Sequence, residues 1–283
     1  MIICRFNEDR LGVVQGDHVI DVTCVLNSLP KYTYPLPSYD VLIANLPSLR
    51  PVLERAAESG PRFLTQEVKF KSPVANPGKI MAAPVNYTEH LAEARDQSEL
   101  NHGRSIEEIQ NIGLFLKATS SLHGQAEGIK LAQSERRTDH ELELVVVIGK
   151  TGRNVSRDDA AAYIAGYTIG LDMTIRGPEE RSMRKSVDTY SIVGPWLVTS
   201  DEINDPSNLD MSLHVNGELR QKANTKELVM NVGALLEFAT SFYSVHPGDL
   251  LFTGTPAGVG PVKVGDTITA AIDQIGSLSI QVT

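Results

Sequence analysis

The segment Glu141-Leu142-Glu143 opens a strongly apolar run that continues through Ile148. In a β-strand alternate side chains share a face, so Glu141 and Glu143 are expected to point the same way. Two buried carboxylates beside such a run are unfavourable unless an opposite charge compensates them. A divalent cation would compensate them, whereas a strand end exposed to solvent would need no compensation. This motif alone leaves both interpretations open.

Asp172 follows a second apolar run, predicted as a strand from Tyr163 to Leu171, and would add a third oxygen ligand. Three carboxylates leave room for water and substrate around Mg²⁺ or Mn²⁺. The shortage of Cys and of clustered His argues against Zn²⁺. The sequence therefore predicts a site for Mg²⁺ (or Mn²⁺) made by Glu141, Glu143 and Asp172.

A second group lies in Asn86-Tyr87-Thr88-Glu89-His90-Leu91-Ala92-Glu93. If this segment is helical, His90 and Glu93 lie on one face, where the carboxylate can orient the imidazole as a general base. The alternative, favoured by this motif alone, is an ordinary pair on a solvated helix face.

Positive charge is concentrated just after Asp172, at Arg176, Arg181, Arg184 and Lys185. Such a cluster suits an anionic substrate. The alternative is a solvated loop in which neighbouring carboxylates cancel the charge, and the two interpretations are equally supported.

The later string Thr253-Gly254-Thr255-Pro256-Ala257-Gly258-Val259-Gly260 lacks the Gly-Lys-Ser/Thr of a phosphate-binding loop, so by itself it indicates a structural turn.

The composition and net charge of the chain exclude some classes of function. With 26 Lys and Arg against 35 Asp and Glu, the 283-residue chain has a net charge of −9, which makes nucleic acid an improbable partner. Its apolar runs are far shorter than the ~20 residues of a membrane helix, so no membrane partner is expected. The start MIICRFNEDR lacks the features of a secretory signal, which predicts a cytoplasmic protein with Cys4 and Cys24 as reduced thiols.

Residues 1–70 are predicted as a small N-terminal domain, a β-meander closed by a helix over Val41–Glu58. Residues 71–283 form the second domain, in which a charged stretch of about 86–113 is expected to be a mobile lid. Many short, β-branched runs and one clear helix, Val232–Tyr243, predict an α+β, mostly β fold.

Eight motifs in order resemble the fumarylacetoacetate hydrolase family over about residues 79–283. They are NYxxHxxE, FLKAxSSLxG, ELELVVVIG, AGYTIGLDMTIR, KSVDT followed by GPW, VNGELRQ with a later NT, PGD and TGTPAGVG. The resemblance implies twisted sheets rolled into a distorted barrel or sandwich, an Mg²⁺ or Mn²⁺ site and a homodimer. The stretch from His90 to Phe115 is longer than in small family members, which suggests a larger or different substrate tail.

The resemblance also implies roles for single residues. Glu141, Glu143 and Asp172 match the metal ligands, and His90 and Glu93 match the dyad that activates water. Lys185 matches the lysine that meets developing negative charge. The residues assigned to substrate binding are Thr255, Arg176, Lys117 and Tyr87.

The leading hypothesis is hydrolysis of a C–C bond in an acylpyruvate-like 1,3-dicarbonyl, a small anionic 2-oxo acid, through a metal-stabilised enolate and water activated by His90. The alternative within enzymes is decarboxylation of oxaloacetate, or isomerisation or tautomerisation of a 2-hydroxydienoate from aromatic-ring breakdown. An inactive binding protein is the alternative of a different class.

Overall fold

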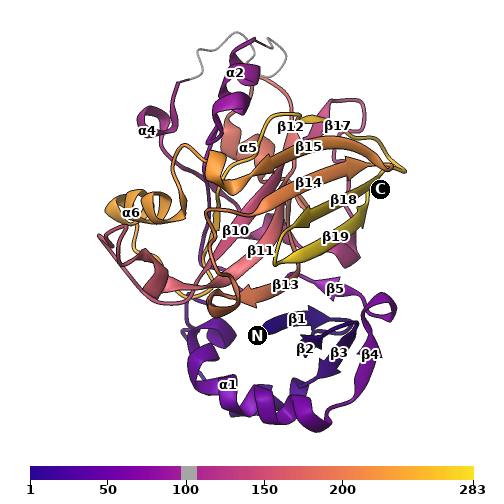
Figure 1. Ribbon diagram of the computed structural model, residues 1–283, viewed down its shortest axis with the longest axis vertical. Coiled ribbons are helices and arrows are strands. Elements are labelled where there is room, and N and C mark those ends of the chain that lie inside the picture. The colour runs from indigo at the N-terminus through magenta and orange to yellow at the C-terminus, as the bar shows by residue number, and fades with distance from the viewer. Residues whose placement is uncertain (97–106) are drawn as a thin grey trace.

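The computed structural model describes residues 1–96 and 107–283, and most of this part of the chain is β-structure. The strands form one large sheet, a four-stranded sheet and a small three-stranded sheet, with few helices around them (Figure 1). The predicted α+β, mostly β class is confirmed. None of the described helices is long and apolar enough to cross a membrane.

The large sheet has ten strands in one continuous order. They are β4 (Arg62–Leu64), β3 (His18–Asp21), β2 (Arg10–Gln15), β1 (Ile2–Phe6), β13 (Ser191–Thr199), β11 (Ile164–Asp172), β10 (Leu142–Ile148), β16 (Leu250–Phe252), β6 (Ile80–Ala82) and β7 (Phe115–Lys117). Two short strands join this order from the side, β5 (Phe70–Lys71) on β1 and β8 (Leu122–His123) on β13. Among the described strands, β4 and β7 do not pair, so the sheet is an open roll rather than a closed barrel.

The centre of the large sheet is the antiparallel pair β10–β11. The apolar side chains of both strands are buried, because the sheet is covered on both faces. The register pairs Leu142 with Leu171 and Glu143 with Gly170, and the Asp172 amide donates to the Glu141 carbonyl at 2.9 Å. The pairing therefore brings the first residues of one strand beside the last residue of the other.

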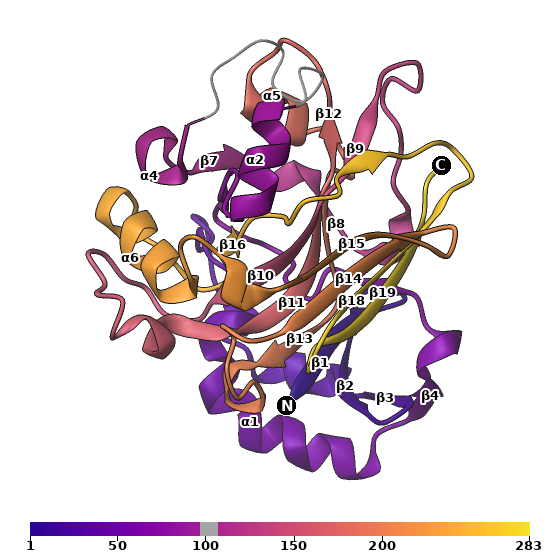
Figure 2. The ribbon, with the colours of Figure 1, turned by 45° about the horizontal axis from the view of Figure 1, so that its top comes forward.

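The four-stranded sheet runs β15 (Glu218–Asn224), β14 (Asp210–Val215), β18 (Thr267–Ile272) and β19 (Gly276–Gln281). It packs over the central strands of the large sheet, as both ribbon views show (Figure 2). Alternate apolar side chains from the two sheets, among them Ile169, Leu213 and Leu278, share one core. The small sheet is β12 (Thr174–Ile175), β9 (Thr138–His140) and β17 (Gly260–Pro261).

The described α-helices are α1 (Val41–Ser59), α2 (Thr88–Asp96), α4 (Ile109–Ile112), α5 (Arg181–Lys185) and α6 (Val232–Phe242). Two of them start at a capping side chain: Asp40 accepts from the Ile43 amide and Asn231 from the Ala234 amide, both at 3.0 Å. Short 3₁₀ turns complete the described elements at η1 (Thr23–Ser28), η2 (Thr65–Glu67), η3 (Thr119–Ser121), η4 (Gln125–Glu127), η5 (Ala160–Tyr163), η6 (Ser200–Glu202) and η7 (Thr225–Glu227).

The N-terminal strands continue the large sheet. β1 pairs antiparallel with β13, with Ile2 opposite Val198 and Ile3 opposite Leu197. One apolar cluster includes Leu11 from β2 together with Val145 and Phe252 from the centre of the sheet. A domain boundary near residue 70 stays a prediction, because hydrogen bonds and packing both cross it.

The predicted lid, about 86–113, lies partly outside the described residues, which omit 97–106. The part that is described differs in one respect from the expectation of a weakly packed segment. Helix α2 buries His90, Leu91 and Ala94, so one of its faces is held against the body of the protein.

A close contact in the large sheet tests the packing of β11 on β13. A Cβ at Gly166 would lie 2.1 Å from the Val198 carbonyl oxygen, a backbone atom that cannot move aside. We expect Gly166→Ala to lower the free energy of unfolding by about 1–3 kcal/mol, as overpacking does. Urea unfolding measures this. The control is Gly260→Ala, whose Cβ would meet its nearest neighbour at 3.5 Å; equal midpoints for the two variants would contradict the packing described.

Candidate active site

A cavity of about 270 Å³ opens where β10 begins and β11 ends. Of the residues singled out by sequence, its wall contains Glu141, Glu143, Asp172, His90, Arg176, Lys185 and Thr255. Segments from distant parts of the chain therefore contribute polar and charged side chains to one space. A concave site with convergent titratable groups is the usual form of an enzyme active site.

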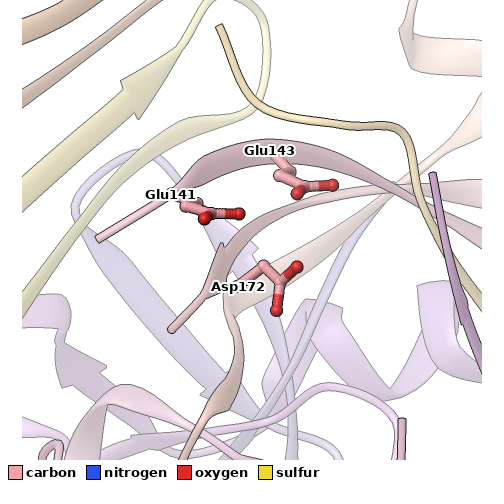
Figure 3. Close-up of side chains that lie close together, drawn as sticks. All are labelled: Glu141, Glu143 and Asp172. Atoms are coloured by element: carbon pink, nitrogen blue, oxygen red, sulfur yellow. The ribbon is translucent and has the colours of Figure 1, made fainter. Parts of the chain in front are cut away.

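Glu141, Glu143 and Asp172, here called the carboxylate trio, point into a common space (Figure 3). One carboxylate oxygen from each lies within 4.8 Å of the others. Their exposed fractions are 4%, 1% and 1%, so the interpretation as strand ends in solvent is wrong. Glu141 lies in the short break between β9 and β10, and it keeps the facing expected from strand alternation.

Three cations surround the trio. Lys185 Nζ donates to Glu141 Oε2 and to Asp172 Oδ2, both at 2.7 Å. Arg176 donates to Glu141 Oε1 at 3.0 Å, and its Nε donates to Asp139 at 2.8 Å. Lys117 donates to Asp172 Oδ1. Glu141 and Asp172 are thus compensated by protein cations.

Glu143 is the member of the trio that these cations do not reach. It accepts a hydrogen bond from the Gly254 amide at 2.6 Å, but no Lys or Arg in the described chain forms an ion pair with it. Burial and the nearby charge of Asp172 raise the pKa of Glu143 well above its ordinary value. Burial acts in the same sense on Glu141, yet Lys185 and Arg176 hold the pKa of that carboxyl well below its usual range.

The donor set fits a hard divalent cation. Its oxygens all come from carboxylates, which Mg²⁺ and Mn²⁺ prefer, and they already converge. Each carboxylate oxygen has two lone pairs, so Glu141 and Asp172 can bind a metal and still accept from Lys185. Lys185 lies beside the trio without contacting Glu143, so the negative charge of Glu143 has no protein cation as a partner. The trio can therefore hold a metal ion.

The His90–Glu93 pair forms on one face of α2, as the spacing predicts. His90 Nδ1 lies 2.9 Å from Glu93 Oε2, and His90 is buried with 6% of its surface exposed. A carboxylate only accepts hydrogen bonds, so in the neutral imidazole Nδ1 carries the proton and Nε2 has the lone pair. The pair is not the solvated surface pair of the alternative interpretation, because His90 is buried and lines the cavity that holds the trio.

The loop from Thr253 to Gly258 contacts both groups. The Gly254 amide holds Glu143, and the Gly258 amide donates to the two oxygens of Glu93 at 3.2 and 3.3 Å. A φ of +100° at Gly254 and +92° at Gly258 explains the glycines, since other residues are strained there. The string is more than a structural turn: it sets the position of a trio member and of the dyad.

Gln221 was not expected from the sequence. Its Nε2 donates to Thr255 Oγ1 at 2.8 Å and to the Pro256 carbonyl at 2.9 Å. Its Oε1 accepts from the Leu142 amide at 3.0 Å and from His140 Nδ1 at 3.1 Å. The buried amide thus joins the start of β10 to the 253–258 loop. Only the VNGELRQ motif pointed to this residue, and no local pattern indicated its partners.

Two residues assigned to substrate binding are not on the cavity wall. Tyr87 is 1% exposed in the apolar core, and its hydroxyl contacts Met211 Sδ at 3.2 Å. Lys117 lies behind Asp172, between that carboxylate and the Tyr190 carbonyl. Burial lowers the pKa of Lys117 and Asp172 opposes that effect. The geometry favours a supporting role for both residues.

The chain is similar to known proteins over its full length. Residues 79–283 match the family model described as fumarylacetoacetate (FAA) hydrolase, C-terminal. A maleylpyruvate hydrolase of Aquipseudomonas alcaligenes is 57% identical over 284 residues, which cover 100% of this chain and 99% of that protein. A mitochondrial oxaloacetate tautomerase of Rattus norvegicus is 35% identical over 228 residues, 76% of this chain and 70% of that protein.

A solved structure is also similar over the full length. It is a maleylpyruvate hydrolase from Sphingobium sp. SYK-6 in complex with manganese(II) and pyruvate, 40% identical, with a TM-score of 0.84 and coverage of 100% of this chain and 99% of that one.

The hydrogen bonds of Gln221 give a testable consequence. Gln221→Leu keeps the side-chain size but leaves buried groups such as the Leu142 amide without a partner, each worth about 1–3 kcal/mol. We expect the free energy of unfolding to fall by about 2 kcal/mol or more, measured by urea unfolding. The exposed Gln281→Leu, which loses one bond to Thr267, is the matched control and should change it by less than ~0.5 kcal/mol. Equal effects would show that the Gln221 bonds carry no stability.

Proposed function

The chain belongs to the fumarylacetoacetate hydrolase family, and we propose that it is a metal-dependent hydrolase that cleaves a C–C bond of an acylpyruvate. Maleylpyruvate, the substrate named for the 57% identical relative, is the proposed substrate. The observation that carries the proposal is that the three buried carboxylates share one cavity with His90, which is paired with Glu93.

Mg²⁺ or Mn²⁺ is the proposed cofactor. The manganese complex of the Sphingobium relative supports a divalent cation, and the all-oxygen trio here supports the same ligands, Glu141, Glu143 and Asp172. When bound, the cation would supply Lewis-acid stabilisation of negative charge on the 2-oxo acid part of the substrate. Lys117, Arg176 and Lys185 already lie beside the trio, so a bound cation would add to the positive charge that favours an anionic substrate.

His90 is the proposed general base. Glu93 holds its Nδ1 proton, which leaves Nε2 to take a proton from water as the water oxygen attacks the acyl carbonyl carbon. The Gly258 amide in turn fixes Glu93, so the imidazole is oriented before substrate arrives. Preorganisation of this kind lowers the cost of reaching the transition state.

Lys185 and Thr255 are proposed to bind the substrate oxygens. The three N–H groups of Lys185 Nζ donate to Glu141, Asp172 and Thr174, and one of these bonds would shift to the substrate oxygen that becomes negative during cleavage. Thr255 Oγ1 accepts from Gln221, so its own hydroxyl hydrogen is directed to another acceptor, and a substrate carboxylate is the proposed one.

The proposed reaction balances without a further reactant. A C–O bond forms between water and the acyl carbon, and the bond from that carbon to C3 of the pyruvate part breaks. The electron pair stays with the pyruvate part, and the proton on His90 Nε2 is available to C3. The products are a carboxylic acid and a 2-oxo acid.

Tautomerisation is the second candidate, supported by the oxaloacetate tautomerase relatives. It would use the trio and Lys185 without water attack. Product analysis separates the two: hydrolysis gives a new carboxylic acid, and tautomerisation an isomer of unchanged mass. The complete set of trio, dyad and lysine weighs against an inactive binding protein. A homodimer and a cytoplasmic location remain proposals from the sequence.

Glu143→Gln tests the metal site. The amide keeps the shape and an acceptor for the Gly254 amide but loses the charge. We expect the dissociation constant for Mn²⁺, measured by titration calorimetry, to rise by more than about tenfold. Glu237→Gln, an exposed pair partner of Arg157, serves as the control and should bind Mn²⁺ like the wild type. Unchanged Mn²⁺ affinity in Glu143→Gln would exclude Glu143 as a ligand.

His90→Gln tests the general base. We expect kcat for maleylpyruvate hydrolysis to fall by about 10²–10⁴-fold, while Mn²⁺ affinity stays close to that of the wild type. Hydrolysis at the wild-type rate would assign water activation to another group. Retained tautomerisation of oxaloacetate together with lost hydrolysis would place His90 in the hydrolytic step alone.

A further inference from the structure

Asp139 is a fully buried carboxylate next to the active site that the proposed reaction does not use. It lies on β9, where its backbone pairs with Thr174 of β12, and it does not line the cavity. Its side chain forms ion pairs with two arginines, Arg137 and Arg176. Arg176 lines the cavity and also contacts Glu141. Asp139 is therefore linked to the carboxylate trio through Arg176.

The two arginines bind carboxylates in different ways. Arg137 places Nε and Nη2 on the two oxygens of Asp139, at 2.8 and 3.1 Å, which is the bidentate arrangement of a guanidinium edge. Arg176 divides the same edge between two carboxylates. Its Nε donates to Asp139 Oδ2 at 2.8 Å, and its Nη2 donates to Glu141 Oε1 at 3.0 Å. Asp139 thus takes one of the two parallel N–H groups with which Arg176 can bind a carboxylate.

The hydrogen bonds of Glu141 leave one position for a metal ion. Each of its two oxygens has two lone pairs. Oε1 accepts from Arg176 and from Thr174 Oγ1, each at 3.0 Å, and Oε2 accepts from Lys185 at 2.7 Å. The described chain gives this carboxylate no further hydrogen bond, so one lone pair of Oε2 remains. A bidentate Arg176 would place its Nε on Oε2 and fill that position.

We propose that Asp139 is a positioning residue for the metal site: it accepts from Nε of Arg176, prevents a bidentate Arg176–Glu141 pair and so keeps a lone pair of Glu141 for the cation. A bidentate pair is stronger than a single charge-assisted bond, so it would compete with the cation for the same carboxylate. The two bonds from Arg137 hold Asp139 in position. This inference rests on the proposed function, because it concerns a ligand of the proposed cofactor.

The test is the affinity for Mn²⁺, measured by titration calorimetry on the metal-free protein. Asp139→Asn keeps the size of the side chain but loses the charge that holds Arg176. We expect the dissociation constant for Mn²⁺ to rise by about tenfold or more, the usual effect of losing a residue that orients a metal ligand. Asp9→Asn is the matched control, because Asp9 also pairs with two cations, Arg5 and Lys71, and does not line this cavity. It should bind Mn²⁺ like the wild type.

A second set of variants separates the positioning of Arg176 from the loss of a nearby negative charge. Arg176→Met has no N–H groups and should bind Mn²⁺ at least as tightly as the wild type, because Glu141 then has more lone pairs available. In that background Asp139→Asn should change the dissociation constant by less than about twofold, since residues that act through one another are not additive. Urea unfolding of each metal-free variant checks that the fold is kept.

Unchanged Mn²⁺ affinity in Asp139→Asn would overturn the role of Asp139 and leave the proposed function standing. Weaker binding in Arg176→Met would do the same, and so would an equal effect of Asp139→Asn with and without Arg176. A wild-type protein that binds no Mn²⁺ would overturn the proposed metal site as well.

Discussion

The constraint on which this structure depends is the burial of three carboxylates at one end of the β10–β11 pair. Burial opposes the ionised form of each carboxylate. Cations from three separate segments form ion pairs with them: Lys117 on β7, Arg176 after β12 and Lys185 on α5. These ion pairs tie β7, β12 and α5 to the central strands, so the segments that form the cavity wall are positioned by the same charges that prepare it for chemistry.

The protein cations compensate the charges of the three carboxylates unevenly. Glu141 and Asp172 have protein partners, while Glu143 has a backbone amide and a raised pKa. The amide belongs to the loop that also contacts Glu93. One short segment therefore positions both Glu143, the carboxylate without a cationic partner, and the proposed base. Gln221 then fixes that segment to the start of β10. The same loop therefore positions a ligand of the proposed metal site and the carboxylate that orients the proposed base.

The features of the site that the sequence predicted are those that depend on local spacing along the chain. Strand alternation placed Glu141 and Glu143 on one face, and a spacing of three placed His90 beside Glu93. What it missed depends on pairing between distant residues. Nothing near Gln221 indicates that its amide meets Leu142 and Thr255, and nothing near Ile2 indicates that β1 extends a sheet at Val198. The same holds for Tyr87 and Lys117. The family motifs contain both residues, but only the tertiary packing shows that they are buried and do not line the cavity.

Hydrolysis and tautomerisation make the same demand on the trio and Lys185, which stabilise negative charge next to a carboxylate. They differ in whether water is activated and in what the rest of the cavity must bind. In this chain the imidazole is buried, its Nδ1 is held by Glu93, and Glu93 is held by a backbone amide. Such an arrangement fixes Nε2 as an acceptor, a requirement of water attack on a carbonyl. The geometry of the dyad therefore favours hydrolysis over a reaction that needs no activated water.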